Sequence, residues 1–316
     1  MKKIVITDAL TVTDGDIDLR FFEAFGQLEI YPLTSYDEVA DRIAEADIVL
    51  CNKTPLDRSI LAEAPHLSYI GLFATGYNNI DIGFAKENGI TVCNAGEYST
   101  NAVAQHTFAL LLEHYSRTAA YDSFVAEEGW VRSKTFSPFV YPTMELAGKT
   151  MGLIGYGSIG HAVAAIARAF GMRVLVYTRT PMEDVSVTFT DLDTLLSASD
   201  VVSVHCPLNE QSKGMFNAQT FAKFRDGAFF INTARGPIVC EEALRDALES
   251  GKLAGAGIDV LDCEPMRGDC VLLGAKNLII TPHVAWAPKE TRRRLVDIVA
   301  DNLRAYLRGE PQHVVS

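Results

Sequence analysis

The stretch that decides the fold is Met151-Gly152-Leu153-Ile154-Gly155-Tyr156-Gly157-Ser158-Ile159-Gly160, in which a short apolar run leads through a glycine-rich turn into an amphipathic helix. Gly155 permits a tight turn, Gly157 lets a ligand approach the backbone, and Gly160 lets the helix pack closely on the strand. The start of the helix offers free N–H groups to phosphate oxygens. The turn therefore predicts a dinucleotide-binding site. The contacts expected from it are Gly155, Gly157, Ser158, Ile159 and Gly160.

Short apolar strands alternate with amphipathic helices on both sides of this turn, which is typical of an α/β fold with parallel sheets. In the second half we expect six strands of a Rossmann sheet, at 150–154, 173–177, 201–205, 228–232, 255–259 and 278–281. In the first half we expect a smaller doubly wound unit with strands at 4–7, 28–31, 48–51, 67–73 and 91–93. Helices are expected between these strands, among them 17–25, 36–43, 159–170, 192–198, 218–224 and 241–249.

Two segments between and after these units have distinct patterns. Residues 102–117 form a helix that is apolar all round, which predicts a buried helix connecting two domains. Residues 121–146 are less regular and rich in aromatic side chains. Composition leaves two interpretations of this segment open: an arm packed on its own domain, or a dimer contact. A final amphipathic helix is expected at 289–307.

Bulk properties exclude several classes of function. The 316 residues, 48% of them hydrophobic, suit two domains rather than one core. The formal net charge of -12 disfavours binding to nucleic acid or to an anionic membrane. The apolar run at the N-terminus is too short for a signal peptide. The six cysteines are scattered, and no two of them form a Cys-x-x-Cys pair. We therefore expect a cytoplasmic protein with reduced thiols and no metal.

The strand after the glycine turn bears on the choice of cofactor. NAD-binding units usually place a carboxylate at the end of this strand, where it accepts hydrogen bonds from the ribose 2′-hydroxyl. Here the strand 173–177 ends in Thr178-Arg179-Thr180. Two hydroxyls and a guanidinium suit a 2′-phosphate, although Arg179 can also be a solvated surface charge. NADP is therefore slightly favoured over NAD, and both remain open.

Three polar side chains follow late strands of the expected sheet, where open α/β sheets bind ligands: Arg235, Glu264 and His283. Each alone has an ordinary structural explanation, as a surface salt bridge, a loop carboxylate or a capping imidazole. Together they fit one reaction. His283 is a natural general acid or base, Glu264 beside it favours the charged imidazole, and Arg235 can hold a carboxylate bidentately. The set predicts hydride transfer to a 2-oxo acid or from a 2-hydroxy acid.

The sequence resembles the D-isomer-specific 2-hydroxyacid dehydrogenases over essentially its whole length. The matching segments are 74–81, 155–160, 205–208, 231–236, 257–265 and 282–283. The resemblance implies Arg235 as substrate anchor, His283 as acid/base and Glu264 as its partner. It implies that the backbone of Ala74, Thr75 and Gly76 holds the substrate carboxylate. Further cofactor contacts are expected from Cys206, Pro207, Thr233 and Asp259.

The resemblance also implies an architecture. A Rossmann domain, 101–284, is inserted into a discontinuous flavodoxin-like substrate domain, 1–100 and 285–316. Subunits of the family pair through their Rossmann domains, which favours a homodimer and the dimer interpretation of 121–146.

Within the family, the segments 52–56, 74–78 and 283–286 look most like the glycerate dehydrogenase (hydroxypyruvate reductase) branch. The expected reaction is NAD(P)H-dependent reduction of hydroxypyruvate or glyoxylate to D-glycerate or glycolate. Trp286 would wall the pocket, and Lys53 lies at its mouth or on the surface. Two alternatives stay open: a D-3-phosphoglycerate or broad 2-ketoacid dehydrogenase, and a nucleotide-sensing scaffold or corepressor.

Overall fold

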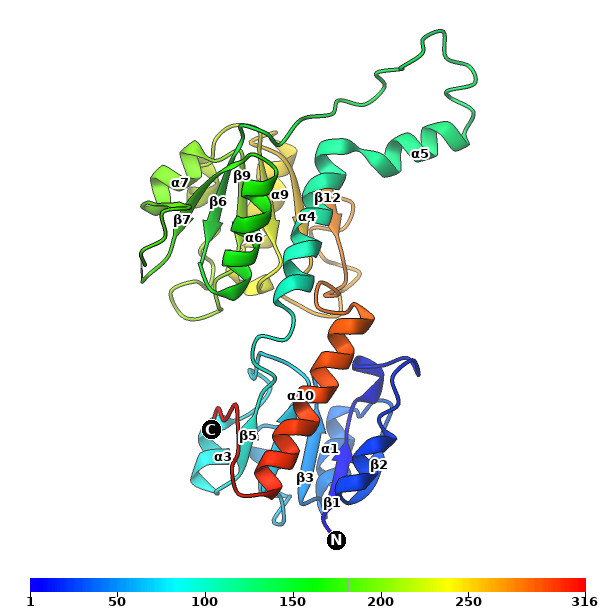
Figure 1. Ribbon diagram of the computed structural model, residues 1–316, viewed down its shortest axis with the longest axis vertical. Coiled ribbons are helices and arrows are strands. Elements are labelled where there is room, and N and C mark those ends of the chain that lie inside the picture. Colours follow the sequence, from blue (N-terminus) through cyan, green and yellow to red (C-terminus); the bar gives the residue numbers. More distant parts are fainter. Residues whose placement is uncertain (181) are drawn as a thin grey trace. The chain divides into compact units, whose positions relative to one another are not determined.

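The computed structural model describes residues 1–180 and 182–316, which form two compact units. Unit 1 comprises Met1–Ser99 and Ala287–Ser316, and unit 2 comprises Thr100–Trp286 (Figure 1). The chain thus leaves unit 1 after Ser99 and returns to it at Ala287, so that unit 2 is an insertion. Each unit is built around its own parallel sheet, and the predicted α/β class is confirmed.

Unit 1 contains a five-stranded sheet in the order β2-β1-β3-β4-β5, with all pairs parallel. This is the flavodoxin-like strand order. The strands are β1 (Lys3–Ile6), β2 (Gln27–Ile30), β3 (Ile48–Cys51), β4 (Tyr69–Leu72) and β5 (Thr91–Cys93). The helices are α1 (Tyr36–Ile43), α2 (Arg58–Ala62), α3 (Ile82–Glu87) and α10 (Lys289–Leu307).

The central strands of unit 1 have the composition that burial on both faces requires. Every residue of β3 and β4 is buried, and nearly all are apolar. The last helix closes one side, where the rings of Tyr306 and Tyr69 lie 4.5 Å apart between centroids. The C-terminal segment therefore belongs to the core of unit 1, although more than 180 residues separate it from Ser99 in sequence.

The prediction of a regular helix at 17–25 is wrong. The segment contains only the short 3-10 helix η2 (Arg20–Phe25), and another, η1 (Ala9–Thr11), precedes it. The buried side chains Ile17, Leu19 and Phe22 are two and three residues apart, a spacing that does not follow one face of an α-helix. An ion pair between Asp16 and Arg292, 2.7 Å from oxygen to nitrogen, also fixes the start of the segment.

Unit 2 contains seven parallel strands in the order β12-β11-β10-β9-β6-β7-β8, which is the Rossmann order extended by one strand. The strands are β6 (Thr150–Ile154), β7 (Arg173–Tyr177), β8 (Thr188–Phe189), β9 (Val201–Val204), β10 (Ala228–Asn232), β11 (Leu253–Ile258) and β12 (Leu278–Ile280). Six of these strands were predicted. The sequence missed β8 because two residues carry no periodicity.

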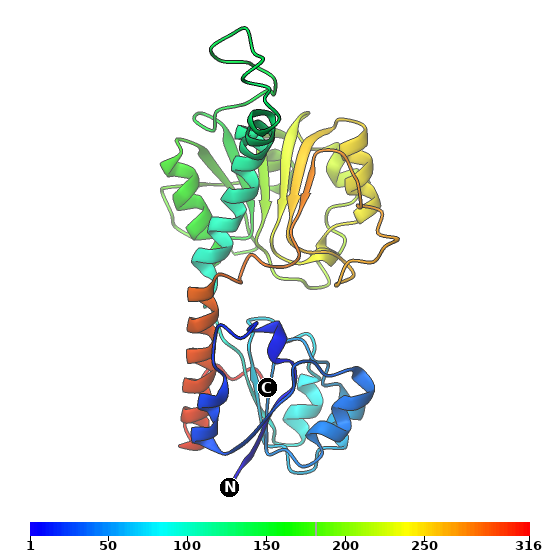
Figure 2. The ribbon, with the colours of Figure 1, turned by 90° about the vertical axis from the view of Figure 1, so that its right-hand side faces the viewer.

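Helices cover both faces of this sheet (Figure 2). The helices of unit 2 are α4 (Thr100–Ser116), α5 (Thr118–Ala126), α6 (Ser158–Ala169), α7 (Leu192–Ala198), α8 (Ala218–Ala222), α9 (Glu241–Glu249) and the 3-10 helix η3 (Gly236–Ile238), and all but α5 lie against the sheet. Neighbouring residues of one strand enter opposite cores: Phe229 packs with α4 and α6, and Phe230 with α7, α8 and α9. This alternation is what two covered faces require.

The predicted burial of α4 is confirmed. Nine of its residues are buried, and the backbone of β11 approaches it closely at two glycines. A Cβ added at Gly257 would lie 2.8 Å from Leu110, and one added at Gly255 would lie 2.7 Å from His114. Burial lowers the pKa of His114 to about 4, so its imidazole is neutral in the core.

The segment after α4 leaves the body of unit 2. Residues 116–145 include no buried residue, and Figure 1 shows α5 and the loop after it projecting from the unit. Trp130, Phe136 and Phe139 are 52%, 90% and 93% exposed. The interpretation of this segment as an arm packed on its own domain is therefore wrong.

Candidate functional site

The glycine turn joins β6 to α6, and its three glycines meet different surroundings. A Cβ at Gly155, where φ is +97°, would lie 2.7 Å from the backbone N of Cys206. A Cβ at Gly160 would lie 2.6 Å from the carbonyl oxygen of Gly155. At Gly157 a Cβ would have nothing within 4 Å. The protein's own packing thus requires the first and third glycines, and the bare backbone at Gly157 faces open space that fits a pyrophosphate.

The N-terminus of α6 begins at this turn. Ser158, Ile159 and Gly160 form its first turn, so their N–H groups have no partner within the helix. The twelve-residue helix also places its positive end there. Both features favour an anion, and the phosphates of a dinucleotide are the anions that this strand–turn–helix arrangement suits.

The end of β7 carries the three residues predicted to face the ribose. Thr178 is partly buried, and Arg179 and Thr180 are exposed. The guanidinium of Arg179 donates a hydrogen bond of 3.4 Å to the side-chain oxygen of Gln211. Hydroxyl and guanidinium donors therefore lie at the strand end, as the sequence predicted.

Asp184, a carboxylate further along this loop, is engaged in hydrogen bonds. Asp184 accepts hydrogen bonds from the Tyr156 hydroxyl, at 2.6 Å, and from the Ser186 backbone N–H, at 2.8 Å. The hydrogen bonds of Ser186 and Tyr156 lower the pKa of Asp184 to about 2, and burial together with Asp184 raises the pKa of Tyr156 to about 12. This link ties the loop after β7 to the glycine turn, and no local sequence pattern predicts it.

His283 and Glu264 come together after β12 and β11. Nδ1 of His283 lies 2.7 Å from Oε2 of Glu264, and Oε1 of Glu264 accepts the Leu261 N–H at 2.9 Å. The two side chains are 26% and 35% exposed, so the pair is reachable from solvent. Because Glu264 uses Nδ1, the other ring nitrogen, Nε2, is the one that can meet a ligand.

Asp259 holds the backbone that carries His283. Its carboxylate is 1% exposed and accepts the N–H groups of Val284, at 2.9 Å, and Ala285, at 2.8 Å. It also accepts the Thr281 hydroxyl at 2.5 Å, and its carbonyl oxygen accepts the His283 N–H at 2.8 Å. His283 has a φ of +55°, which is uncommon for a residue other than glycine. The sequence predicted Asp259 as a cofactor contact and missed this backbone role.

A histidine from α4 completes this network. Nε2 of His106 lies 2.8 Å from the Thr281 hydroxyl and 3.5 Å from the Asp259 carboxylate. His106 lies in an apolar helix, more than 150 residues from both partners in sequence. No spacing pattern could have connected them.

Arg235 lies on the loop after β10. Asn232, the last residue of that strand, donates from its amide to the Arg235 carbonyl at 2.9 Å and accepts the Ala234 N–H at 3.0 Å. The guanidinium donates to the Ala234 carbonyl at 2.7 Å. The hydroxyl oxygen of Thr233 lies 3.3 Å from the hydroxyl oxygen of Thr107 on α4. The loop that presents Arg235 is therefore fixed from both sides.

Cys206 and Pro207, predicted to contact the cofactor, follow β9 opposite the glycine turn. The backbone of Cys206 is the part that comes closest to Gly155. Burial raises the pKa of the Cys206 thiol, which favours its neutral form. Burial also lowers the pKa of the preceding His205 to about 3, and its Nε2 contacts the Ser203 hydroxyl at 2.9 Å.

The remaining predicted substrate residues, apart from Trp286 at the end of unit 2, belong to unit 1. The Ala74 carbonyl accepts the Ala95 N–H at 2.9 Å, the Thr75 hydroxyl donates to the Gly96 carbonyl, and the Thr75 carbonyl accepts the Asn94 amide at 2.7 Å. Gly76 follows directly and is partly buried. The backbone of 74–76 is thus held at the end of β4.

Lys53 follows β3 on a loop that a buried carboxylate holds. Asp8, which is 3% exposed, accepts the backbone N–H groups of Asn52, Lys53 and Thr54 at 2.6 to 3.1 Å. Asp8 follows β1, so the loop is fixed where the strand order of unit 1 reverses. Sequence reasoning predicted Lys53 and missed Asp8, whose partners are backbone groups.

Comparison with known proteins decides the family. Residues 108–285 match the family model of the D-isomer specific 2-hydroxyacid dehydrogenase NAD binding domain. A hydroxypyruvate reductase of Blautia hydrogenotrophica is 45% identical over 320 residues, covering 99% of each chain. The chain belongs to the D-isomer specific 2-hydroxyacid dehydrogenase family. It is an oxidoreductase with a nicotinamide dinucleotide cofactor, as the sequence predicted.

Other relatives and solved structures of this family agree. A glycerate dehydrogenase of Methylorubrum extorquens is 38% identical over 99% of each chain. A structure of D-lactate dehydrogenase from Aquifex aeolicus, complexed with NAD and lactic acid, has a TM-score of 0.85 at 29% identity, covering 97% of this chain and 96% of that one. An NADPH-dependent glyoxylate/hydroxypyruvate reductase from Sinorhizobium meliloti, with NADP and malonate, has a TM-score of 0.86 at 29% identity, covering 100% and 97%.

No helix among residues 1–180 and 182–316 has the length and apolar character needed to cross a membrane. Among the same residues, no group of three or more histidine, cysteine, aspartate or glutamate side chains could hold a metal ion.

The unequal surroundings of the glycines give a direct test of the turn. We expect Gly157→Ala to leave the melting temperature of the apoprotein nearly unchanged and to weaken NADPH binding by about tenfold or more, because the new methyl group meets only the ligand. Gly160→Ala, the matched control, should lower the melting temperature, since its methyl group overlaps a carbonyl oxygen. Thermal unfolding and fluorescence titration measure the two effects. Unchanged NADPH affinity in Gly157→Ala would contradict this assignment.

Proposed function

We propose that the protein reduces hydroxypyruvate or glyoxylate to the D-2-hydroxy acid with NAD(P)H. The observation that carries the proposal is the contact of 2.7 Å between Nδ1 of His283 and Oε2 of Glu264. Both residues lie on loops that follow strands of the same sheet as the glycine turn. A histidine whose Nδ1 is held by a carboxylate is oriented for proton transfer at Nε2. Relatives named hydroxypyruvate reductase, glycerate dehydrogenase and glyoxylate reductase support this choice of substrates.

In this proposal each residue of the site has one task. The bound dinucleotide supplies the hydride. Arg235 binds the substrate carboxylate and, through its positive charge, polarises the adjacent carbonyl. His283 donates the proton from Nε2 to the carbonyl oxygen, which becomes the hydroxyl of the product. Glu264 keeps the imidazole oriented through its contact with Nδ1.

The proposal assigns the remaining substrate contacts to Ala74, Thr75, Gly76, Lys53 and Trp286. The backbone of 74–76 is held by hydrogen bonds of the Ala74 carbonyl and of the Thr75 hydroxyl and carbonyl, and its N–H groups are proposed to share the substrate carboxylate with Arg235. Lys53 and Trp286 are proposed contacts for the far end of a short substrate. The rigid support that Asp8 gives the Lys53 backbone favours such a role, because a fixed loop loses little entropy on binding.

Replacement of the proposed proton donor tests this function. We expect His283→Ala to lower kcat/KM for hydroxypyruvate by about 100-fold or more while NADPH binding stays unchanged, since a general acid commonly contributes that much. Glu264→Gln should lower kcat less, because the amide oxygen still accepts a hydrogen bond. His66→Ala removes an exposed histidine of unit 1 and serves as the control.

Steady-state kinetics with hydroxypyruvate and glyoxylate measure these effects. Activity of His283→Ala within a few-fold of the wild type would contradict the assignment of His283. A wild-type protein that binds NADPH but reduces neither acid, nor any other 2-oxo acid, would instead favour a nucleotide-sensing scaffold.

We further propose that NADP(H) is used at least as well as NAD(H). The donors Thr178, Arg179 and Thr180 suit a 2′-phosphate. The carboxylate of Asp184, further along the same loop, is engaged with Tyr156 and Ser186, so it is not free to accept from a 2′-hydroxyl.

Removal of the guanidinium tests this preference. We expect Arg179→Ala to lower kcat/KM for NADPH by about 10- to 100-fold and to leave that for NADH within a few-fold, because a hydrogen bond to a charged group contributes about 1.5–3 kcal/mol. Arg168→Ala, which removes an exposed arginine from α6, is the matched control. A wild-type enzyme with a strong preference for NADH would contradict the proposal.

We also propose a homodimer formed through the projecting segment 118–145. Its side chains Trp130, Phe136 and Phe139 are exposed in the single chain, and exposed aromatic side chains are enriched at protein interfaces.

The mass in solution tests this proposal. We expect twice the chain mass of 34.5 kDa in sedimentation equilibrium. Phe136→Ser combined with Phe139→Ser should shift the population toward monomer, because both side chains lose the apolar area that they would bury. Val185→Ser, at an exposed apolar residue outside this segment, should leave the mass unchanged. A monomeric wild-type protein would contradict the proposal.

A further inference from the structure

The loop that carries Glu264 has no regular secondary structure, so specific contacts must fix it. One contact is internal: the Leu261 N–H donates to Oε1 of Glu264. A second comes from outside the loop. The Asp262 N–H donates to Oε1 of Glu241 at 2.9 Å, and Glu241 is the first residue of α9.

The other carboxylate oxygen of Glu241 is also engaged by this connection. Oε2 accepts the Cys270 thiol, with 3.6 Å between sulfur and oxygen. Burial raises the pKa of the Cys270 thiol, and the charge of Glu241 raises it further, so the thiol keeps the proton that it donates. Both oxygens of one carboxylate thus hold the connection between β11 and β12, at Asp262 and at Cys270.

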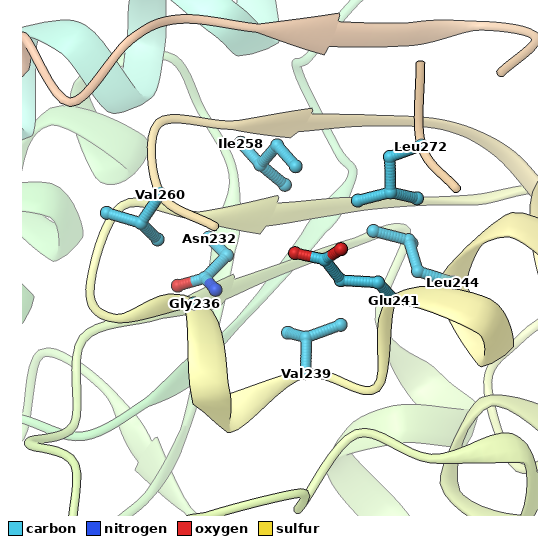
Figure 3. A pocket seen from close by; sticks show the side chains of 8 residues that line it. All are labelled: Asn232, Gly236, Val239, Glu241, Leu244, Ile258, Val260 and Leu272. Atoms are coloured by element: carbon cyan, nitrogen blue, oxygen red, sulfur yellow. The ribbon is translucent and has the colours of Figure 1, made fainter. Parts of the chain in front are cut away.

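The same region links the Glu264 loop to the Arg235 loop. Gly236, directly after Arg235, packs so closely that a Cβ there would lie 1.9 Å from the Leu261 carbonyl. Figure 3 shows the Glu241 carboxylate pointing toward Asn232 across a small cavity that Gly236 and Val260 also line, and the Asn232 amide donates to the Arg235 carbonyl. Glu241 therefore lies in a packed region from which two loops lead, one carrying Arg235 and the other carrying Glu264.

We propose that Glu241 is a positioning residue for Glu264, and through it for His283. This inference rests on the proposed function of that pair. Glu241 contacts the backbone of the loop. The length of its side chain is the determining property, since the carboxylate must extend from α9 to the Asp262 N–H. A displacement of about 1 Å at a catalytic group can lower a rate by up to about 100-fold, so this single hydrogen bond has a measurable effect on turnover.

A carboxylate at the start of a helix also stabilises the helix by its charge, and the test must separate the two effects. Glu242, the next residue of α9, is exposed and provides the matched control for charge at the helix end. Glu241→Asp keeps the charge but shortens the side chain by one methylene group, so it loses reach. Glu241→Gln removes the charge but keeps an oxygen that can accept the Asp262 N–H.

We expect Glu241→Asp and Glu241→Ala to lower kcat for hydroxypyruvate by about tenfold or more, with the KM for NADPH unchanged. Glu241→Gln should keep kcat within about threefold, because the acceptor for Asp262 remains. Glu242→Ala should match the wild type. Hydrogen–deuterium exchange of the peptide covering 260–265 should quicken in Glu241→Asp and Glu241→Ala only.

The exchange measurement separates this inference from the proposed function. Absent turnover in the wild type would overturn the function, whereas exchange at 260–265 still reports on the loop. Unchanged exchange and unchanged kcat in Glu241→Asp would overturn the role of Glu241. Equal losses in Glu241→Gln and Glu241→Asp would also overturn it, because they would make charge the determining property.

Discussion

The buried carboxylate of Asp259 is the interaction on which the site depends. A carboxylate that is 1% exposed is costly to bury unless its oxygens are fully hydrogen-bonded. Here they accept the N–H groups of Val284 and Ala285 and the Thr281 hydroxyl. The need to satisfy this charge fixes the chain after β12, and so holds His283 in its left-handed conformation beside Glu264. Loss of any one donor would leave part of the charge unpaired in the core.

Unit 1 uses the same solution. Asp8 follows β1 and accepts three consecutive N–H groups of the loop after β3. In both sheets a carboxylate at the carboxyl end of one strand fixes a loop that follows another. Parallel strands make this possible because all their carboxyl ends lie at one edge of the sheet. Glu241 adds a third carboxylate that accepts from loop backbone, in this case from α9.

The sequence predicted the parts of this arrangement that have a local pattern. The glycine turn, the six longer strands of unit 2 and the residue types at Arg235, Glu264 and His283 are all visible in short windows. The sequence missed β8 and the 3-10 segment at 20–25, since neither is long enough for periodicity to show. The roles of Asp8 and Asp259 were also missed. Both carboxylates accept from backbone N–H groups, which nearly every residue type has, so no residue type in the sequence identifies their partners. His106 and Asp184 depend on contacts between distant segments, which only the fold brings together.

In the proposed function, His283 and Arg235 direct a reduction at C2 of a short 2-oxo acid. The most direct measurement follows the hydrogen itself, with NADPH carrying deuterium on the transferring face of its nicotinamide ring and hydroxypyruvate as substrate. We expect D-glycerate with one deuterium at C2, detected by mass spectrometry and chiral chromatography. L-glycerate, or D-glycerate without deuterium at C2, would contradict it.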